Sequence, residues 1–299
     1  MKRKIIKQDI EKINHLLNEV FNTGTYKCIE RLGGLTNHTY RVTLENEREY
    51  VVRIPGEGTE DMIVRSNEKI STELACELGI DTNMIYFGKD GSKITEYISD
   101  AITMTSDMLH QEKYIKEMAE IFRKLHSCDV DTKVPFEVFD MAKEYENIIL
   151  DKRVSMYGDY QQTKEKVMEI KEAIDSQFNI KKVPCHNDAL CENWVWGNNR
   201  MYLIDWEYAG MNDGMWDLAD VSIEAGYDEK MDEILLRAYL DRDLGVSDLK
   251  HFLANKIYVD FLWTLWAKAR VPYSGQEMEN WATERYVRLK ENIRKIEEI

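Results

Sequence analysis

Short apolar and aromatic runs, broken by turn residues, dominate the first hundred positions of the chain. Runs of this length, rich in Val, Ile and Tyr, predict antiparallel strands joined by hairpins. The expected strands are 27–32, 38–44, 50–54, 84–87 and 93–98. Between them, Asp61–Leu78 is expected to be helical and to end at Gly79, because glycine readily takes the left-handed conformation that closes a helix.

After about residue 100 the spacing of apolar residues changes to the period of a helix. One such helical face carries Ile115, Met118, Ala119, Phe122 and Leu125. Further helices are expected at 137–152, 160–178, 228–241, 247–270 and 276–297. A hairpin interrupts them, where strands 193–196 and 201–204 flank Gly197-Asn198-Asn199.

This pattern predicts an α+β fold with two parts. The first, 1–98, is expected to be a small antiparallel β-sheet lobe. The second, 99–299, is expected to be a large helical lobe.

The composition is that of a globular protein, with 43% hydrophobic and 32% charged residues among 299. The net charge of −15 repels phosphate backbones and anionic lipid, so nucleic acid is not expected as a partner, whereas a cationic ligand is compatible with it. No secretory signal or membrane-spanning apolar stretch is visible, and no stable membrane insertion is expected. The five cysteines include no Cys-x-x-Cys pair, which favours reduced thiols and a cytoplasmic location.

The densest group of polar residues lies at 186–193 and 203–207, on both sides of the predicted hairpin. Because a tight hairpin brings the outer ends of its strands together, four oxygen-bearing side chains can converge there. They are Asp188, Asn193, Asp205 and Glu207. A hard cation such as Mg²⁺ relieves the repulsion among the carboxylates, so a magnesium site is expected.

The five-residue offset from Asp188 to Asn193, followed by Asp205, resembles the catalytic core of protein-kinase-like phosphotransferases. Trp206-Glu207 stands where protein kinases have Phe-Gly. The string His-Asn-Asp-x₄-Asn, with Ile-Asp-Trp-Glu-Tyr-Ala-Gly-x-Asn-Asp-x-x-x-Asp-Leu-Ala, is similar to the choline/ethanolamine kinase family. The similarity is close over 183–220 and looser over most of the chain. It implies a protein-kinase-like bilobal fold that uses ATP and Mg²⁺. In that fold 1–98 is expected to bind the nucleotide, and 99–299 is expected to carry the catalytic loop and the substrate pocket.

The resemblance also implies roles for individual residues. Asp188 is expected to accept the proton of the substrate hydroxyl, while Asn193 and Asp205, with Glu207 beside them, are expected to bind Mg²⁺. Arg53 stands in place of the kinase lysine, and Glu68 is its expected partner, with Glu73 as the alternative. The expected nucleotide-binding residues are Gly33, Gly34, Thr36, Asn37, Arg53, Glu68, Glu96 and Ile98, the last two at the hinge. The glycine pair taken alone is equally compatible with an ordinary hairpin turn.

Trp263 and Trp266 share one face of a predicted helix, and Trp281 follows. Aromatics at helical spacing are usually core residues, but aromatic faces also bind quaternary ammonium groups. By resemblance to the family, these three tryptophans and Tyr227 are expected to line a choline pocket, with Glu207 or another acid nearby.

The sequence therefore predicts an ATP-dependent phosphotransferase acting on a small cationic amino alcohol, with choline preferred to ethanolamine, that releases phosphocholine and ADP. An aminoglycoside phosphotransferase and a non-catalytic amine-binding pseudokinase are the alternatives, and monomer and homodimer both stay open. His186 and Asp217 are expected to brace the catalytic loop, and His126 to be a satisfied core residue. No chemistry is assigned to Cys185 or Cys191.

Overall fold

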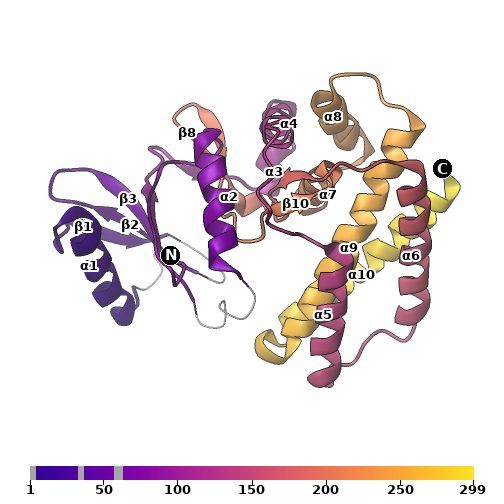
Figure 1. The fold of residues 1–299 in the computed structure, drawn as a ribbon, viewed down its shortest axis with the longest axis horizontal. Helices are drawn as coiled ribbons and strands as arrows, with labels where there is room; N and C mark the ends of the chain where they lie inside the picture. Colours follow the sequence, from indigo (N-terminus) through magenta and orange to yellow (C-terminus); the bar gives the residue numbers. More distant parts are fainter. Residues whose placement is uncertain (1–4, 33–36, 57–62) are drawn as a thin grey trace. The chain divides into compact units, whose positions relative to one another are not determined.

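The computed structural model describes residues 5–32, 37–56 and 63–299 and divides into two compact units. The first unit comprises Met1–Met104 and Glu192–Tyr208, and the second comprises Thr105–Cys191 and Ala209–Ile299 (Figure 1). The segment Glu192–Tyr208 therefore packs with the N-terminal part of the chain, although it lies far into the stretch where the sequence predicts the helical lobe.

A five-stranded antiparallel sheet forms the centre of the first unit, in the order β1-β2-β3-β5-β4. Its strands, all at predicted places, are β1 (Cys28–Arg31), β2 (His38–Thr43), β3 (Glu49–Ile54), β4 (Met84–Phe87) and β5 (Lys93–Glu96). Helix α1 (Lys7–Phe21), which the sequence analysis did not predict, buries Ile13 and Leu17 against the sheet (Figure 1).

Helix α2 (Arg65–Glu77) follows β3 in the chain and ends as predicted. Gly79 has φ +64°, and Ile80 N donates to Ala75 O at 2.8 Å, which closes the last turn of the helix. The expected start of this helix at Asp61 lies outside the described residues.

The remaining strands of the first unit are β6 (Ile102–Thr103), β8 (Trp194–Gly197) and β9 (Arg200–Leu203), which form a second antiparallel sheet. The predicted hairpin between β8 and β9 turns at Asn198 and Asn199, with φ of 49° and 58°. Asn193 itself belongs to the short 3₁₀ turn η1 (Cys191–Asn193), not to the strand in which it was expected.

Helices make up most of the second unit. They are α3 (Ser106–Leu109), α4 (Glu112–His126), α5 (Val138–Asp151), α6 (Tyr160–Gln177), α7 (Gly214–Ala225), α8 (Glu229–Leu240), α9 (Val246–Ser274) and α10 (Gln276–Glu298). Helix α9 packs against α5, α7 and α10, and the last of these runs beside it in Figure 1. The predicted apolar face of α4 is buried along its whole length.

Two short strands, β7 (Val183–Cys185) and β10 (Gly210–Asn212), pair in the second unit, and both precede α7 in the chain. Neither these strands nor α7 was predicted from the sequence. Residues 186–189, the expected catalytic loop, follow β7 directly. The start of the loop is therefore held by backbone pairing, because Cys185 lies opposite Gly210 of β10.

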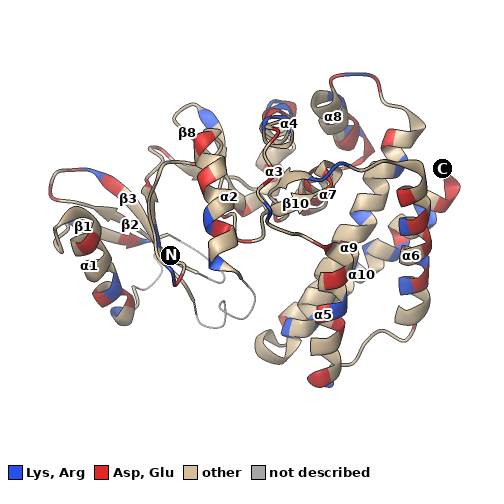
Figure 2. Cartoon of the chain, in the orientation of Figure 1, with Lys and Arg blue, Asp and Glu red and all other residues tan. Residues whose placement is uncertain are grey.

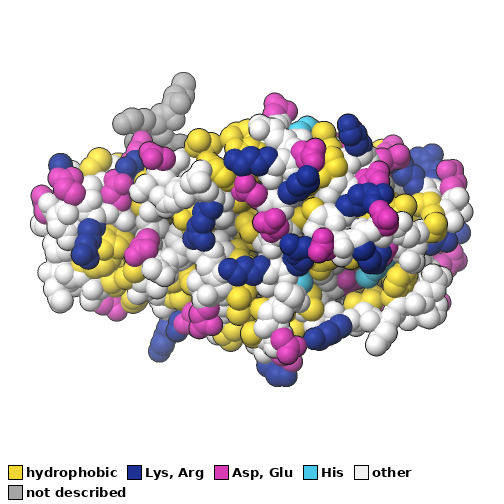
Figure 3. All heavy atoms as spheres, turned by 90° about the horizontal axis from the view of Figure 1, so that it is seen from above, with side chains coloured by type: hydrophobic (Ala, Val, Ile, Leu, Met, Phe, Trp, Pro, Cys, Tyr) yellow, Lys and Arg dark blue, Asp and Glu magenta, His cyan; other side chains and the backbone are white. Residues whose placement is uncertain are grey.

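Charged side chains of both signs line the outer helices, as on α6 in Figure 2. Lys166 of α6, for example, pairs with Glu169 and with Glu297 of α10. On the face drawn in Figure 3, acidic and basic side chains are interspersed. Among the described residues, no helix is long and apolar enough to cross a membrane.

Candidate active site

Arg53, near the end of β3, forms a buried ion pair with Glu68 of α2, with 2.5 Å between Nη1 and Oε1. Both side chains are nearly inaccessible to solvent. Burial lowers the pKa of Arg53, but Glu68 and Asp205 together raise it above its ordinary value, so the guanidinium stays charged. The structure thus joins Arg53 to Glu68, whereas Glu73, the alternative, pairs with Lys69 on the exposed side of α2.

Four further charged residues complete this group, which we call the Arg53 cluster. Arg65 lies 2.7 Å from Glu68 and 3.4 Å from Glu207 through Nη1, and Lys93 lies 3.8 Å from Glu68 through Nζ. Asp205 accepts from Arg53 at 3.3 Å. The Arg53 cluster therefore comprises Arg53, Arg65, Lys93, Glu68, Asp205 and Glu207.

Glu207 and Asp205 lie close enough to repel each other. Burial, followed by the charge of Asp205, raises the pKa of Glu207 to about 7. The Glu207 carboxylate accepts from Asn37 Nδ2 at 3.1 Å, and its side chain is only 5% exposed. Asp205 has φ +69°, a left-handed conformation that asparagine and aspartate tolerate better than most residues. The backbone here is shaped to present a carboxylate.

The donor atoms of this region fit a hard divalent cation. Asp205 and Glu207 offer carboxylate oxygens, and Asn37 and Asn193 offer amide oxygens, which are the ligands that Mg²⁺ prefers. The buried Asn37 Oδ1 has no hydrogen-bond partner among the described residues, so a lone pair is left for a ligand. A cation would also relieve the repulsion that raises the pKa of Glu207.

The structure gives no direct support for nucleotide binding by the other residues that were expected to bind it. Gly33, Gly34 and Thr36 lie outside the described residues. Glu96 is exposed; its N–H donates to Asn83 O at 3.0 Å and its carbonyl accepts from Thr82 Oγ1 at 3.1 Å. Ile98 is buried in a small apolar cluster with Val195 and Tyr202. Both backbone groups of Glu96 are thus already engaged within the unit.

In the second unit, Asp217 of α7 binds backbone N–H groups of the expected catalytic loop. Its Oδ2 accepts from His186 N at 2.8 Å, and its Oδ1 accepts from Asn187 N at 2.7 Å. His186 Nδ1 in turn lies 3.3 Å from Asp188 N. The predicted bracing roles of Asp217 and His186 are confirmed by these contacts.

Asp220, one turn further along α7, holds the next part of the loop. Its Oδ2 accepts from Ala189 N at 2.5 Å, directly after the partly buried Asp188. Burial, Glu224 and Asp188 raise the pKa of Asp220 well above its usual range. The candidate catalytic base is therefore held in place from α7 through its two neighbouring residues.

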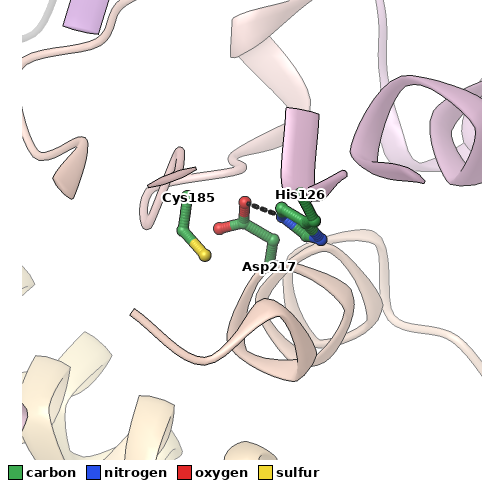
Figure 4. A group of neighbouring side chains, drawn as sticks. All are labelled: His126, Cys185 and Asp217. Atoms are coloured by element: carbon green, nitrogen blue, oxygen red, sulfur yellow. Dashed lines mark hydrogen bonds and ion pairs between the residues drawn. The ribbon is translucent and has the colours of Figure 1, made fainter. Parts of the chain in front are cut away.

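His126, Cys185 and Asp217 lie within 4.8 Å of one another through their possible ligand atoms, and among the described residues this is the group that most resembles a metal site (Figure 4). However, His126 contacts Asp217 through Nε2 at 3.1 Å and Tyr239 through Nδ1 at 2.9 Å. Burial raises the pKa of the Cys185 thiol, which opposes the thiolate that a metal needs. The contacts confirm His126 as a satisfied core histidine, and the group is structural.

A ladder of four indole rings, which we call the tryptophan ladder, runs from α7 across α9 to α10. Trp216, Trp263, Trp266 and Trp281 meet edge to face, with centroids separated by 6.5, 6.1 and 6.0 Å in that order. Such T-shaped pairs are a favoured aromatic geometry. The three tryptophans that the sequence singled out are therefore in mutual contact, and Trp216 extends the row inward.

Cations already lie on two of these rings. The guanidinium carbon of Arg285 is 3.9 Å from the centroid of Trp281, and that of Arg270 is 5.4 Å from Trp266. The ladder thus has the electrostatic character that binds cations. Tyr227, the expected fourth wall, is buried and donates its hydroxyl to Leu109 O at 2.8 Å, beside His110. No ring contact between Tyr227 and the ladder is found among the described residues.

A second group of buried charges, which we call the Arg285 cluster, surrounds Arg285 of α10. It comprises Arg285, Arg288, Asp220, Glu224 and Asp260. Carboxylates outnumber guanidiniums in it, and burial raises the pKa of Asp260 above its usual value although both arginines lower it. This excess of acids favours an additional cation nearby.

Sequence reasoning missed Arg65, Asp220, Glu224 and Arg285. A signal for the two acids was present, because Asp213 and Gly226 mark the start and the end of α7 and place Asp217, Asp220 and Glu224 on one helical face. Nothing in the sequence marked Arg65 or Arg285, because charged helix residues are usually solvent-exposed.

A sequence model of the family described as choline/ethanolamine kinase matches residues 29–255 of the chain. The chain belongs to the choline/ethanolamine kinase family. The match includes Arg53, Glu68, Asp188, Asn193 and Asp205, and it ends before the three outer members of the tryptophan ladder. The family and the enzyme class predicted from the sequence are both confirmed.

Curated relatives agree with this assignment. Protein LicA of Haemophilus influenzae is 25% identical over 262 residues, which are 85% of this chain and 76% of LicA. Ethanolamine kinase 2 of Mus musculus is 26% identical over 270 residues, which are 81% of this chain and 69% of the mouse protein. Relatives named for LicA and for ethanolamine kinase are thus about equally distant.

Solved structures show the same fold. A choline/ethanolamine kinase family protein from Mesorhizobium loti has a TM-score of 0.84 and 28% identity, covering 95% of this chain and 94% of that one. Choline kinase LicA from Streptococcus pneumoniae has a TM-score of 0.82 and 27% identity, covering 97% and 100%, and a structure of LicA in complex with AMP gives 0.77 and 28%, covering 97% and 98%. The aminoglycoside phosphotransferase APH(2'')-Ib, at 19% identity and TM-score 0.63 over 96% and 97%, shares the fold alone. The predicted protein-kinase-like α+β fold is confirmed.

Proposed function

We propose that this member of the family transfers the γ-phosphoryl group of ATP to the hydroxyl of choline, in preference to ethanolamine, and releases phosphocholine and ADP. The observation that carries the choice of amine is the tryptophan ladder with buried carboxylates behind it. The chemistry of the transfer rests on the Arg53 cluster and on Asp188.

The Arg53 cluster suits the polyphosphate of a nucleotide. The Arg53 guanidinium is fixed by Glu68 and by Gly91 O, to which Nη2 donates at 2.8 Å, so it is already oriented before a ligand arrives. Pre-organised cations lower the cost of binding and of charge development in phosphoryl transfer. The LicA structure in complex with AMP supports a nucleotide site in a relative of this chain.

Asp205, Asn193 and Glu207 would hold Mg²⁺, together with the amide oxygen of Asn37. When bound, the ion neutralises charge on the phosphates. Arg53 and Arg65 orient these carboxylates through the ion pairs Arg53–Asp205 at 3.3 Å and Arg65–Glu207 at 3.4 Å. The protein thus supplies a rigid set of oxygen ligands.

Asp188 would hydrogen-bond to the substrate hydroxyl and accept its proton as the new phosphate ester bond forms. Its position depends on Asp217 and Asp220, which fix the loop backbone before and after it. General bases of this kind work only when they are held within hydrogen-bond reach of the proton. The α7 helix therefore has a positioning role in the reaction.

The tryptophan ladder favours a quaternary ammonium ion over a primary one. Choline spreads its charge over methyl groups and has no N–H donor, so aromatic faces and a negative field suffice to bind it. Ethanolamine has a compact, strongly hydrated ammonium group that needs hydrogen-bond acceptors in exchange for its water. An aminoglycoside carries several such amines and has the same need.

A coupled ADP-release assay with choline, ethanolamine and kanamycin tests the proposal. The expected order of kcat/KM is choline, then ethanolamine, with kanamycin at background. A higher kcat/KM for ethanolamine would contradict the amine preference, and activity on kanamycin would support the aminoglycoside alternative. ATP binding without turnover of any amine would support the pseudokinase alternative.

A further inference from the structure

Arg285 is the residue through which the tryptophan ladder and the Arg285 cluster meet. Its guanidinium carbon lies 3.9 Å from the ring centre of Trp281, Nη1 lies 3.3 Å from Asp260 Oδ1, and Nη2 binds Glu224 Oε1. The residue is only 3% exposed. One side chain thus contacts an aromatic wall and two carboxylates from two other helices, α9 and α7.

Carboxylate oxygens of Asp260 and Glu224 accept hydrogen bonds from the two arginines of this cluster. Both oxygens of Asp260 accept from Arg288, at 2.6 and 2.8 Å, and Oδ1 also faces Arg285. Glu224 Oε1 accepts from Arg285. Three carboxylate oxygens close to Trp281, namely Glu224 Oε1 and both oxygens of Asp260, therefore already accept from a guanidinium and are less available to an incoming ammonium.

We infer that Arg285 is a specificity-determining residue that favours quaternary over primary ammonium substrates by occupying the carboxylate of Glu224 beside the tryptophan ladder. The inference rests on the proposed function, since it assumes that the ladder receives the amine. A quaternary ammonium ion has no N–H donor and binds to aromatic faces, so it does not need the Glu224 oxygen that Arg285 occupies. A primary ammonium ion has three N–H donors, and each one without an acceptor incurs a desolvation cost.

The distinguishing measurement is the ratio of kcat/KM for choline to that for ethanolamine. In Arg285→Gln, the freed Oε1 of Glu224 can accept from a primary ammonium, while Arg288 still binds both oxygens of Asp260. The ratio should therefore fall by about tenfold, which corresponds to about 1.4 kcal/mol. The KM for ATP should stay within about twofold, because Arg285 contacts residues of the second unit only.

Arg288→Gln is the matched control. Arg288 lies on the same helix and binds the same Asp260, but its side chain is 36% exposed and no contact with a tryptophan ring is found for it among the described residues. Its substitution should leave the ratio within about twofold of the wild type. If the ratio fell equally in both variants, the inference would be overturned. The effect would then result from the loss of one positive charge in the Arg285 cluster, whichever arginine was replaced.

Arg285→Gln leaves two buried carboxylates short of positive charge and can fail to fold. Arg285→Lys keeps the charge, reaches only one carboxylate at a time and is expected to lower the ratio in the same direction by a smaller factor. In the wild type itself, kcat/KM should rise steadily through ethanolamine, its N-methyl and N,N-dimethyl derivatives and choline.

A wild-type series without this trend, or a ratio unchanged in a folded Arg285 variant, would overturn the inference. By contrast, a wild type that phosphorylates neither amine would refute the proposed function instead. The two failures are therefore distinguishable within one set of assays.

Discussion

The two units of the molecule each bury a cluster of ion pairs, but the surroundings of the carboxylates differ. In the Arg53 cluster, Asp205 and Glu207 stand beside amide oxygens such as that of Asn37. In the Arg285 cluster, Glu224 and Asp260 stand beside an arginine that lies on an indole ring. Both clusters have carboxylates whose pKa values burial raises.

The different surroundings of the carboxylates indicate which kind of cation each cluster can bind. Carboxylates among oxygen donors suit a small, hard divalent ion, whereas carboxylates behind aromatic rings suit a large, weakly hydrated organic one. Burial creates a need for positive charge in both places, and the neighbouring side chains decide what kind of positive charge satisfies it. Each of the following predictions tests one side of this contrast.

The largest effect is expected at Asp188, which belongs to neither cluster but is held by α7. Asp188→Asn should lower kcat by about 10²–10⁴-fold, because the amide cannot accept the hydroxyl proton. Nucleotide affinity and thermal stability should stay near wild type, since Asp205 and the Arg53 cluster are untouched. A wild-type kcat at saturating substrate would show that Asp188 is not the base.

Removing one partner of the buried pair in the first unit should be costly for folding. Glu68→Gln leaves Arg53 buried without its main partner, and we expect the free energy of unfolding to fall by about 3–5 kcal/mol. Glu73→Gln, which breaks an exposed pair on the same helix, should cost at most about 0.5 kcal/mol. Equal losses in denaturant titrations of the two variants would contradict the assigned pairing.

The raised pKa of Glu207 predicts a pH dependence of stability with a definite sign. Because its pKa rises from 4.5 to about 7 on folding, the folded state binds the proton more tightly than the unfolded state. The contribution of Glu207 to stability should therefore be most favourable below pH 4.5 and be lost as the pH rises to about 7, by up to about 3 kcal/mol.

The measurement is urea unfolding between pH 4.5 and 8 without metal or nucleotide, for the wild type and Glu207→Gln. The difference in unfolding free energy between them should drift in favour of the variant as the pH rises. If the unfolding free energies of the two proteins change in parallel with pH, the pKa of Glu207 is not raised in the folded state. Addition of Mg²⁺ and nucleotide should make the wild-type stability depend less on pH.

The smallest effect is expected from substitutions in the tryptophan ladder. Trp266→Leu keeps apolar volume but removes one π-face of the ladder, so the KM for choline should rise by a few-fold to thirtyfold, the range of about 0.5–2 kcal/mol per cation–π contact. The KM for ethanolamine should rise less, and the KM for ATP should stay unchanged. Trp263→Ala should act in the same direction, with an added loss of stability because Trp263 is 5% exposed.

Trp196→Leu is the control for this prediction, since Trp196 is also partly buried but lies on β8 in the first unit. It should leave the KM for choline near wild type. Equal rises in KM for ATP and choline in Trp266→Leu would show that the ladder is only a packing element.

The sequence determined most of the elements and indicated which residues are candidates for the reacting groups. Strands of the first sheet, the buried face of α4 and the Asn198-Asn199 turn followed from local patterns, because hydrophobic period and turn residues act within a few positions. The Asp188–Asn193 offset and the string around Asp205 were enough to indicate the family, which the match over 29–255 confirms.

Only the tertiary structure decided how the charges are paired. In the structure Arg53 pairs with Glu68 and not with Glu73, and Arg65 pairs with Glu207. Arg285 lies between Trp281 and two carboxylates. Residues 53 and 68, or 224 and 285, come together because separate elements pack, and the benefit of a buried ion pair depends on burial and geometry that no local pattern records. Helix propensity places Arg285 on α10, but only the packing of α7, α9 and α10 makes it a buried partner of an aromatic wall.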